Sequence, residues 1–448
     1  MARSERVLST VLRRLERSPS FWHYVSLGAG LVTILYLQRD QWFFFDEWVF
    51  LLVDGPDLWA AHVGHWSTSP TLIYDGLRAV FGLHTYFPFA LLVTLLHLSA
   101  AHLAWRISLN CGANPWLATT GALIFVFFGT GAENIFWAFQ IGYIGALVFG
   151  LLAFYLSLAA KISVLRFVCI TAISLFSLTW SGTSIPLVVA TVALMAWRHG
   201  WRRGVILGAV TAAAYLIWYA LYSLGTGPDT GGFGLHKLGI AMPQFIGVML
   251  ILGFGDIFPI PGLGFVVLLA LGVWVVITIR RRINLPRALP TIFLIGGAAV
   301  FALLTAFSRA TMSVGSGRSS RYVYLVTLLL LPALTVALTH VLRGRRPAIL
   351  IASLLLVALA GYQTSVLVQA SAIQAKTEQS TKRLLSAALD LYLKDTPGLR
   401  LDASPDSRWA PDVQMHDLVD LYDAGYFTES QFTDADLKKA SANVVVAP

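Results

Sequence analysis

Residues 41–50 read QWFFFDEWVF, and residues 62–66 read HVGHW a short distance later in the chain. Both stretches fall between the first two long apolar segments of a sequence that is 57% hydrophobic and only 12% charged. Carboxylates placed among aromatic rings are costly, because a buried polar group loses its hydration. The region 39–86, which concentrates acids, histidines and tryptophans, is therefore the first candidate for a functional site.

The composition of the whole chain predicts the fold class. Soluble domains contain about 25% charged residues, roughly twice the proportion found here. A helix needs about 17–25 apolar residues to cross the hydrocarbon core of a bilayer. We therefore predict an all-α polytopic membrane protein, with the lipid bilayer as a partner and about eleven transmembrane helices, at about 20–38, 86–106, 115–131, 137–160, 164–181, 184–198, 204–223, 262–280, 288–307, 322–342 and 347–368.

The charged residues predict the orientation in the membrane. The net charge is +9, and cytoplasmic loops of membrane proteins are enriched in Lys and Arg. With the N-terminus inside, most basic residues fall in inner loops, and every acid between residues 17 and 370 falls outside. The sequence thus predicts a multi-pass protein of the plasma (inner) membrane with its C-terminus outside. Because topology accounts for the basic residues, we predict no nucleic-acid partner.

Three parts are expected along the chain. Residues 1–19 form a basic cytoplasmic segment, residues 20–369 a transmembrane domain, and residues 370–448 a small helical segment on the outer face. The composition becomes that of a soluble segment after residue 370, but few aliphatic residues are available there to bury. We therefore expect the last part to dock on the membrane domain or on the loop 39–86, since so small a core is marginal alone.

The long outer loops 39–86 and 224–261 are each expected to hold an interfacial helix. In the second loop, residues 239–258 are apolar but interrupted by Pro243, several glycines and Asp256. Counting this stretch as a span would place the basic run 280–282 outside, against the positive-inside rule. Broken backbone at membrane depth is tolerated only where protein or a cavity covers it. We predict a re-entrant or interfacial helix here, and a true span is the alternative.

The adjacent acids Asp46 and Glu47 are the candidates for catalysis. Desolvation by the neighbouring rings would raise a carboxyl pKa toward the range that suits a general base. The simpler alternative is an acidic N-cap at the start of a short interfacial helix, surrounded by an aromatic belt. The two interpretations are compatible, because a cap also fixes the position of the carboxylate.

His62 and His65 have the three-residue spacing that places two side chains on one face of a helix. A metal ion would need a third ligand, which Asp46, Glu47 or Asp75 could supply. Two loop histidines more often hydrogen-bond a substrate or the backbone. We therefore assign His62, His65 and Trp66 to substrate binding and expect no cofactor. A divalent metal near Asp46 and His65 is the less favoured alternative.

A second outer turn carries polar and aromatic residues that would suit a sugar. It reads GTGAENIFWAFQ at residues 129–140 and includes Glu133, Asn134, Trp137 and Gln140. A tryptophan ring combines an apolar body with a polar tip, and such rings pack against pyranose faces. We assign these four residues to substrate binding. The alternative is an ordinary polar turn between two spans.

Three arginines lie in the outer loop 308–321, where the positive-inside rule predicts few. The planar guanidinium group of arginine suits bidentate binding of phosphate. We assign Arg309, Arg318 and Arg321 to a lipid-linked phosphate, with Tyr322 beside them as a substrate contact. Snorkelling toward lipid headgroups is the alternative, although it explains one arginine better than three.

Topology and short motifs together resemble the GT-C superfamily of integral-membrane glycosyltransferases, which includes protein mannosyltransferases and aminoarabinose transferases. The resemblance rests on the inside N-terminus, the acid pair just past the first span, and the stretches FDEW, GHWS, ENIFWAFQIGY and SRYVY. The same stretches are similar to uncharacterised actinobacterial membrane proteins of this type. The outer C-terminal segment is shorter than the large sugar-binding domains that some members carry.

The resemblance implies a fold, a donor and roles for particular residues. The donor would be a polyprenyl-phosphate-linked sugar, and the acceptor a glycan or lipid of the cell envelope. Asp46 would act as the general base on the acceptor hydroxyl with Glu47 as its partner, and Arg321 would meet the donor phosphate. The transfer would invert the anomeric carbon and would need no metal.

A glycolipid or lipid-carrier transporter or flippase, without chemistry, is the alternative function. Transport pathways tend to place ionisable residues inside the spans, and these spans contain few. A purely structural membrane protein would leave the outer arginines unexplained. The sequence does not identify the sugar, the acceptor or the length of the lipid carrier.

Overall fold

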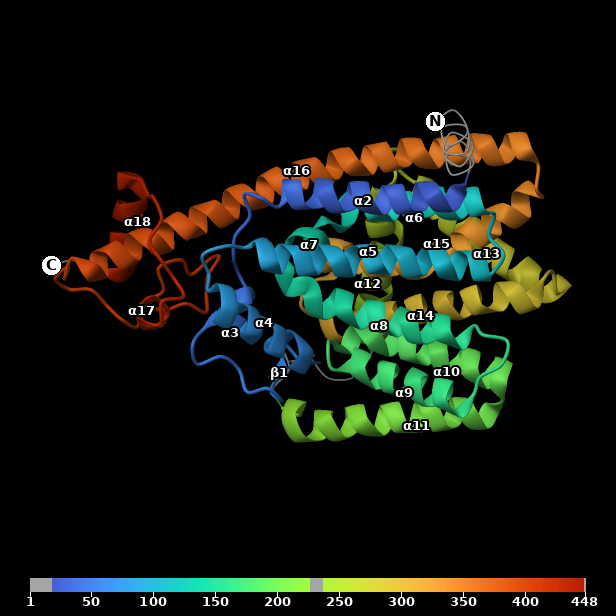
Figure 1. The fold of residues 1–448 in the computed structure, drawn as a ribbon, viewed down its shortest axis with the longest axis horizontal. Helices are drawn as coiled ribbons and strands as arrows, with labels where there is room; N and C mark the ends of the chain where they lie inside the picture. The colour runs from blue at the N-terminus through green and yellow to red at the C-terminus, as the bar shows by residue number, and fades with distance from the viewer. Residues whose placement is uncertain (1–17, 226–236, 447–448) are drawn as a thin grey trace, which may run out of the picture.

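The computed structural model describes residues 18–225 and 237–446. Its helices run side by side along the long axis of the molecule (Figure 1). In the described residues one small sheet is present, where β1 (Ala61–His62) pairs with β2 (His65–Trp66) in antiparallel register. Nearly all of the predicted basic segment 1–19 and the middle of the predicted loop 224–261 lie outside the described residues. The predicted class, an all-α polytopic membrane protein, is confirmed.

A helix covers the greater part of every predicted span. Several of these helices have a proline in the first turn, where its missing N–H leaves no bond unmade and its fixed φ suits the helix. They are α2 (Pro19–Leu37), α5 (Phe87–Asn110), α6 (Pro115–Val126), α8 (Ile141–Ser157), α9 (Val164–Leu178), α10 (Ile185–His199), α11 (Trp201–Trp218), α13 (Leu263–Arg281), α14 (Leu285–Arg309), α15 (Ser320–Leu342) and α16 (Arg346–Leu393).

Fewer helices qualify as membrane spans than the sequence predicts. Nine helices in the described ranges are long and apolar enough to cross a membrane, or ten if α6 and its continuation through α7 (Ala132–Phe136), bent by 44°, form one span. Helices α9 and α10 have 15 residues each, fewer than the roughly 17 that a span needs. The predicted eleven spans and their sidedness therefore stay predictions.

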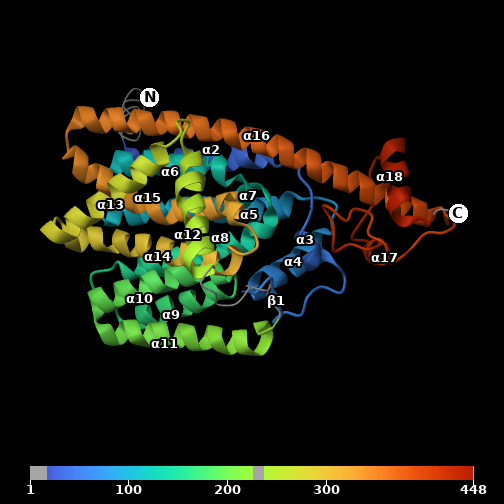
Figure 2. The ribbon, with the colours of Figure 1, turned by 180° about the vertical axis from the view of Figure 1, so that it is seen from behind.

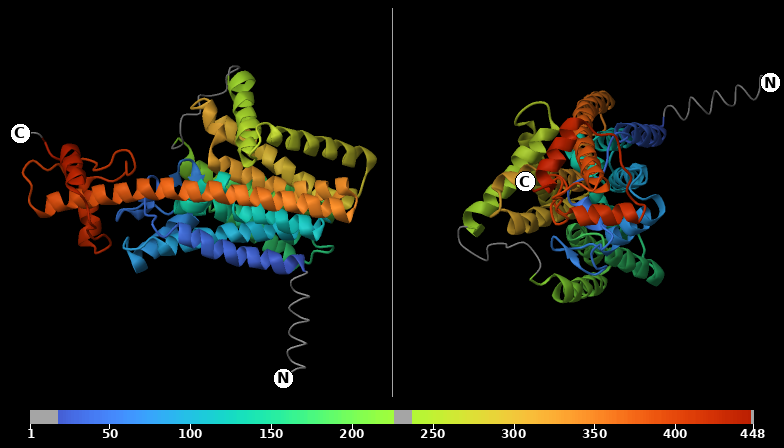
Figure 3. Two further views of the ribbon diagram at one scale, coloured as in Figure 1. Left: turned by 90° about the horizontal axis from the view of Figure 1, so that it is seen from above. Right: turned by 90° about the vertical axis from the view of Figure 1, so that its left-hand side faces the viewer.

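The segment Lys237–Ile257 takes a different course from the other helices. It consists of η5 (Lys237–Ala241), α12 (Met242–Gly247), η6 (Val248–Gly253) and η7 (Phe254–Ile257). Figures 2 and 3 show it crossing the bundle at a steep angle. Its end is fixed by Gln363 of α16, whose Nε2 donates to the carbonyl of Ile257 at 2.8 Å. A segment that runs across the bundle is what an interfacial or re-entrant helix would give, but its length and apolar character also suit a span.

Helix α16 has 48 residues and continues without a break through residue 370, where the sequence predicts a domain boundary. Its second half extends beyond the bundle (Figure 3). There it carries α17 (Met415–Asp423) and α18 (Asp434–Val444), which pack on a small core of buried leucines and alanines. One continuous helix therefore joins the C-terminal segment to the membrane domain.

The loop 39–86 lies at the same end of the bundle as the C-terminal segment (Figure 1). It contains α3 (Glu47–Leu51), the β1–β2 hairpin and α4 (Thr68–Phe81). Its first residues are held by an aromatic core, because Trp42, Phe43 and Trp48 are at most 2% exposed. The ring of Phe43 meets the rings of Tyr86 and Phe89 edge-on, with centroids 5.0 and 4.9 Å away. This packing fixes the backbone that carries the two acids.

Candidate active site

The two adjacent acids point in different directions. Glu47 is fully buried, and its Oε1 accepts hydrogen bonds from the hydroxyls of Tyr74 (2.8 Å) and Tyr86 (3.2 Å). Its Oε2 accepts the backbone N–H of Phe44 at 3.1 Å. Burial raises the pKa of Glu47 to about 8. Glu47 was predicted to act in catalysis beside Asp46, but here it anchors the loop from inside the core and does not line the cavity that Asp46 faces.

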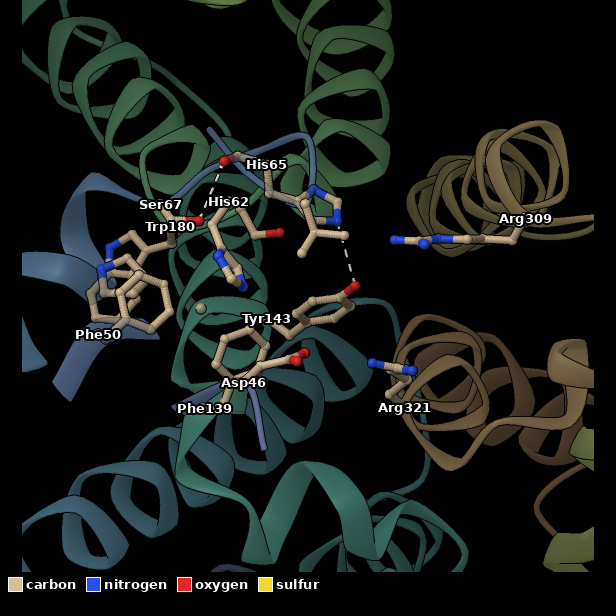
Figure 4. A pocket seen from close by; sticks show the side chains of 14 residues that line it. Asp46, Phe50, His62, His65, Ser67, Phe139, Tyr143, Trp180, Arg309 and Arg321 are labelled. Carbon is tan, nitrogen blue, oxygen red and sulfur yellow. Dashed lines mark hydrogen bonds between the residues drawn. The ribbon is translucent and has the colours of Figure 1, made fainter. Parts of the chain in front are cut away.

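Asp46 faces a cavity with about 480 Å³ of free space, including its open mouth (Figure 4). It occupies the N-cap position of α3, yet its side chain makes no capping hydrogen bond. The described residues offer its carboxylate no hydrogen bond of any kind, so both oxygens remain available to a ligand. The simple capping alternative therefore does not account for this carboxylate.

The ionisation of Asp46 reflects opposing influences. Burial raises its pKa to about 6, Arg321 and Arg309 act to lower it, and Asp412 and Glu133 act to raise it. A carboxyl with a pKa near 6 is ionised at neutral pH and still takes up a proton readily, which suits a general base. The position and the ionisation of Asp46 agree with the same role.

The hairpin, rather than a helix, places the two histidines in the cavity wall. Val63 and Gly64 both have positive φ, +50° and +77°, as a two-residue turn of this type requires. His62 and His65 are therefore direct cross-strand partners, and the predicted helical face was wrong because the chain reverses at Val63 and Gly64, where positive φ interrupts any right-handed helix. Burial lowers the pKa of each histidine to about 4, so both are neutral at pH 7.

The histidines have few partners within the protein. His65 Nε2 lies 3.5 Å from the hydroxyl of Tyr143, and Nε2 of His62 is buried without a hydrogen-bond partner. Neutral imidazoles at a cavity wall can donate to or accept from a substrate hydroxyl. Among the described residues, no three His, Cys, Asp or Glu side chains are grouped so that they could hold a metal ion.

Two of the three predicted phosphate-binding arginines line the cavity opposite Asp46 (Figure 4). Arg309 is the last residue of α14, and Arg321 is in the first turn of α15. Arg321 also lies 3.5 Å from the carboxylate of Glu133. Arg318, in η8 (Val314–Arg318), instead makes two bonds of 2.6 Å to the carboxylate of Asp256 and does not line the cavity. The structure thus brings together two of the three arginines.

The residues of the second outer turn lie behind the cavity. Glu133 accepts a hydrogen bond from Ser319 (3.3 Å) in addition to its ion pair with Arg321. Asn134 and Gln140 are fully buried, and Trp137, 4% exposed, packs against the rings of Phe44 and Phe45. None of these four predicted substrate contacts lines the cavity. Their packing supports the wall that carries Asp46 and Arg321.

Two further predicted substrate contacts, Trp66 and Tyr322, do not line the first cavity. The ring of Trp66 stacks on Trp218 with centroids 5.2 Å apart. Tyr322 lines a second, larger space of about 1520 Å³ that shares Val63, His65, Tyr143 and Arg309 with the first. The far walls of this second space are mainly aromatic and apolar and include Tyr215, Tyr219, Phe301, Leu304 and Phe307. The first space is therefore a charged chamber, and the second is a mainly apolar groove between helices that adjoins it.

Several residues of the cavity wall were not singled out from the sequence. Tyr143, Trp180 and Ser181 all line the first cavity. Tyr143 lies one helical turn after Gln140, inside the stretch ENIFWAFQIGY, so its position near the outer turn was visible in the sequence. Trp180 and Ser181 lie at the break between α9 and η3 (Gly182–Ser184). Nothing local in their sequence indicates that this break faces Asp46.

Comparisons with known proteins give similarity at the level of structure. No family profile matches the sequence, and no curated protein matches it significantly. Among solved structures, the chain is similar to the crystal structure of ArnT from Cupriavidus metallidurans bound to undecaprenyl phosphate, with a TM-score of 0.47 and 14% sequence identity. The similarity covers 94% of this chain and 88% of that one.

Proposed function

We propose that this protein is a glycosyltransferase of the plasma membrane that transfers a sugar from a polyprenyl-phosphate-linked donor to a cell-envelope acceptor on the outer face. The observation that carries the proposal is the opposition of Asp46 to Arg309 and Arg321 across one cavity. One wall offers an unpaired carboxylate, and the other offers two guanidinium groups. A glycosyl transfer needs both groups: a carboxylate to take the proton of the acceptor hydroxyl, and guanidinium groups to bind the anionic leaving group of the donor.

The groove beside the chamber suits the remainder of such a donor. Arg309 lines both spaces, so a phosphate held there would have the charged chamber on one side and the apolar groove on the other. A polyprenyl chain is purely apolar and is stabilised by contact with aromatic and aliphatic walls. A free sugar phosphate or a nucleotide sugar has no long apolar chain to fill this groove.

The proposed reaction is a displacement at the anomeric carbon. Asp46 takes the proton from the acceptor hydroxyl, and the acceptor oxygen attacks the anomeric carbon from the face opposite the phosphate. The bond from this carbon to the phosphate oxygen breaks, and its electron pair leaves with the polyprenyl phosphate. Arg309 and Arg321 stabilise the charge that develops on the leaving group. The configuration at the anomeric carbon is inverted.

The remaining residues of the chamber would orient the substrates. His62 and His65 are neutral and can hydrogen-bond sugar hydroxyls without adding charge. Glu47 would act through the loop that it anchors and would not touch the substrate. We expect no metal to be required, because the two arginines can supply the positive charge that a metal would otherwise provide at the leaving group.

The experiment is a transfer assay with the full chain in lipid nanodiscs, using radiolabelled polyprenyl-phosphate sugars and an extract of cell-envelope acceptors. We expect transfer by the wild type, and a loss of about 10²- to 10⁴-fold in Asp46→Asn, as is typical for removal of a general base. Asp46→Asn keeps the shape of the side chain, so folding should be preserved. Undiminished transfer in Asp46→Asn would exclude it as the base. Donor binding by the wild type with no turnover would favour the transporter alternative.

A further inference from the structure

The C-terminal segment contacts the residues just before Asp46. The backbone N–H of Phe45 donates a hydrogen bond of 2.5 Å to the carbonyl oxygen of Trp409. The ring of Trp409 lies 6.2 Å from that of Phe44 and 6.4 Å from that of Phe45, measured between centroids. More than 360 residues separate these partners in the sequence, so the contact exists only because α16 carries the C-terminal segment back to this end of the bundle.

The backbone at Phe45 needs such support. Its φ is +54°, in the left-handed region that favours glycine and is uncommon for other residues. A residue in this conformation persists only where its surroundings determine it. Here the carboxylate of Glu47 accepts the N–H of Phe44, and the carbonyl oxygen of Trp409 accepts the N–H of Phe45. The turn at Phe45 directly precedes Asp46 and sets the direction in which that side chain leaves the backbone.

The loop that presents Trp409, residues 406–413, is itself anchored on α16. The side chain of Asp406 is 5% exposed, and its Oδ2 accepts a hydrogen bond from the hydroxyl of Thr381 at 3.1 Å. Its Oδ1 accepts the backbone N–H groups of Arg408 (3.4 Å) and Trp409 (3.3 Å). The buried carboxylate of Asp406 therefore joins α16 to the loop whose Trp409 holds Phe45.

Helix α16 holds the other end of the same aromatic stretch. Oε2 of Glu378 accepts the backbone N–H of Trp42 at 2.9 Å. Glu378 precedes Thr381 by three residues, so both lie on one face of the helix. The segment from Trp42 to Phe45 is thus fixed at its start directly by α16, and at its end through the 406–413 loop.

The same loop also places a charge near Asp46. The charged groups that act on Asp46 are Arg321 and Arg309, from α15 and α14, together with Asp412 from the loop and Glu133 from α7. The carboxylate of Asp412 opposes ionisation of Asp46, as Glu133 does, whereas the arginines favour it. Asp412 is the one member of this set that the C-terminal segment supplies.

We propose that the 406–413 loop is a positioning element for the general base: Trp409 holds the turn that aims Asp46, and Asp406 anchors Trp409 on α16. The proposal rests on the proposed function, because it assigns Asp46 as the base. Asp406 and Trp409 are positioning residues, since neither lines the cavity. The C-terminal segment, which looks like an appendage, then completes the active site.

The test uses Asp406→Ala in the nanodisc-reconstituted enzyme, which removes the anchor of the loop. We expect kcat to fall at least about tenfold while donor binding at Arg309 and Arg321 stays within about twofold, since misplacement of a catalytic group is costly in rate. The control is Asp436→Ala, which breaks the ion pair of α18 with Arg383 of α16, away from Phe45. Equal losses in both variants would mean general destabilisation of the segment and would overturn the positioning role.

Hydrogen exchange separates this proposal from the proposed function. Peptides covering residues 42–48 should exchange slowly in the wild type and faster in Asp406→Ala, but not in Asp436→Ala. This readout does not require turnover. If the wild type transferred no sugar, the proposed function would fail, while the exchange result would still show whether the loop holds the turn. Unchanged exchange in Asp406→Ala would overturn the structural part of the proposal, whatever the activity.

Discussion

The carboxylate of Asp46 faces the guanidinium group of Arg321 across the cavity, and the two groups form no ion pair in the described structure (Figure 4). Arg321 is instead paired with Glu133, at 3.5 Å. Had Asp46 and Arg321 paired with each other, the carboxylate of Asp46 would not be free to accept a proton from a substrate. Glu133 thus keeps Arg321 ordered while leaving Asp46 open.

Arginine substitutions should distinguish the cavity from the protein surface. We expect Arg309→Ala and Arg321→Ala each to weaken donor binding by roughly 10- to 100-fold, the usual effect of losing a hydrogen bond to a charged group. Arg318→Ala should bind the donor as the wild type does, because Arg318 is engaged with Asp256 away from the cavity. Isothermal titration calorimetry with a polyprenyl phosphate measures these affinities. Equal weakening in all three variants would indicate nonspecific attraction to the headgroup.

The rate of transfer should depend on the ionisation of Asp46. A general base works in its ionised form, and burial raises the pKa of Asp46 to about 6. The rate should therefore rise as the pH increases through about 6 and become constant above it. Transfer rates measured at saturating donor between pH 4.5 and 8.5 check this prediction. The residual activity of Asp46→Asn should not rise with pH in this way. If it still rose as the pH increased through about 6, the titration would belong to another group.

Glu47 should make stability depend on pH. Burial raises its pKa to about 8 in the folded protein, well above the value of about 4.3 expected in an unfolded chain. The folded state therefore binds more protons between these values, so stability should fall as the pH rises from about 4.5 to 8. Glu47→Gln keeps much of the hydrogen-bonding capacity but cannot ionise. Its melting temperature in detergent should fall less steeply than that of the wild type across this range.

The difference between the wild type and Glu47→Gln in how steeply the melting temperature falls with pH is specific to Glu47. Asp46, whose pKa is also raised, contributes a fall of the same sign below pH 6, and this contribution is present in both proteins. A difference between pH 6 and 8 therefore belongs to Glu47. Parallel melting curves for the two proteins would contradict the burial of an ionisable carboxyl at this position.

Removal of divalent metals should leave transfer unchanged. The described residues contain no group of three or more possible metal ligands, and Arg309 and Arg321 can stabilise the leaving phosphate by themselves. We expect full activity after dialysis against EDTA and no stimulation by added magnesium or manganese. Loss of activity with EDTA that manganese restores would instead support a metal near Asp46 and His65.

The sequence by itself determined the membrane class, the approximate positions of the helices and the importance of the region 39–86. These properties are local, because the length of an apolar segment and the charges beside it can be read without knowing what they contact. The concentration of acids and histidines in an apolar chain likewise marked a site before any partner was known. Asp46, His62, His65, Arg309 and Arg321 were all identified in this way, and all line the cavity.

Tertiary structure decided which of these groups meet. Asp46 and Glu47 are adjacent, but successive helical residues point about 100° apart, so one faces the cavity and the other the core. Arg318 and Arg321 differ by three positions, yet Asp256 engages only the first. The contact of Trp409 with Phe45 depends on the path of α16. Side-chain direction and long-range contacts are consequences of packing, which no local pattern in the sequence records.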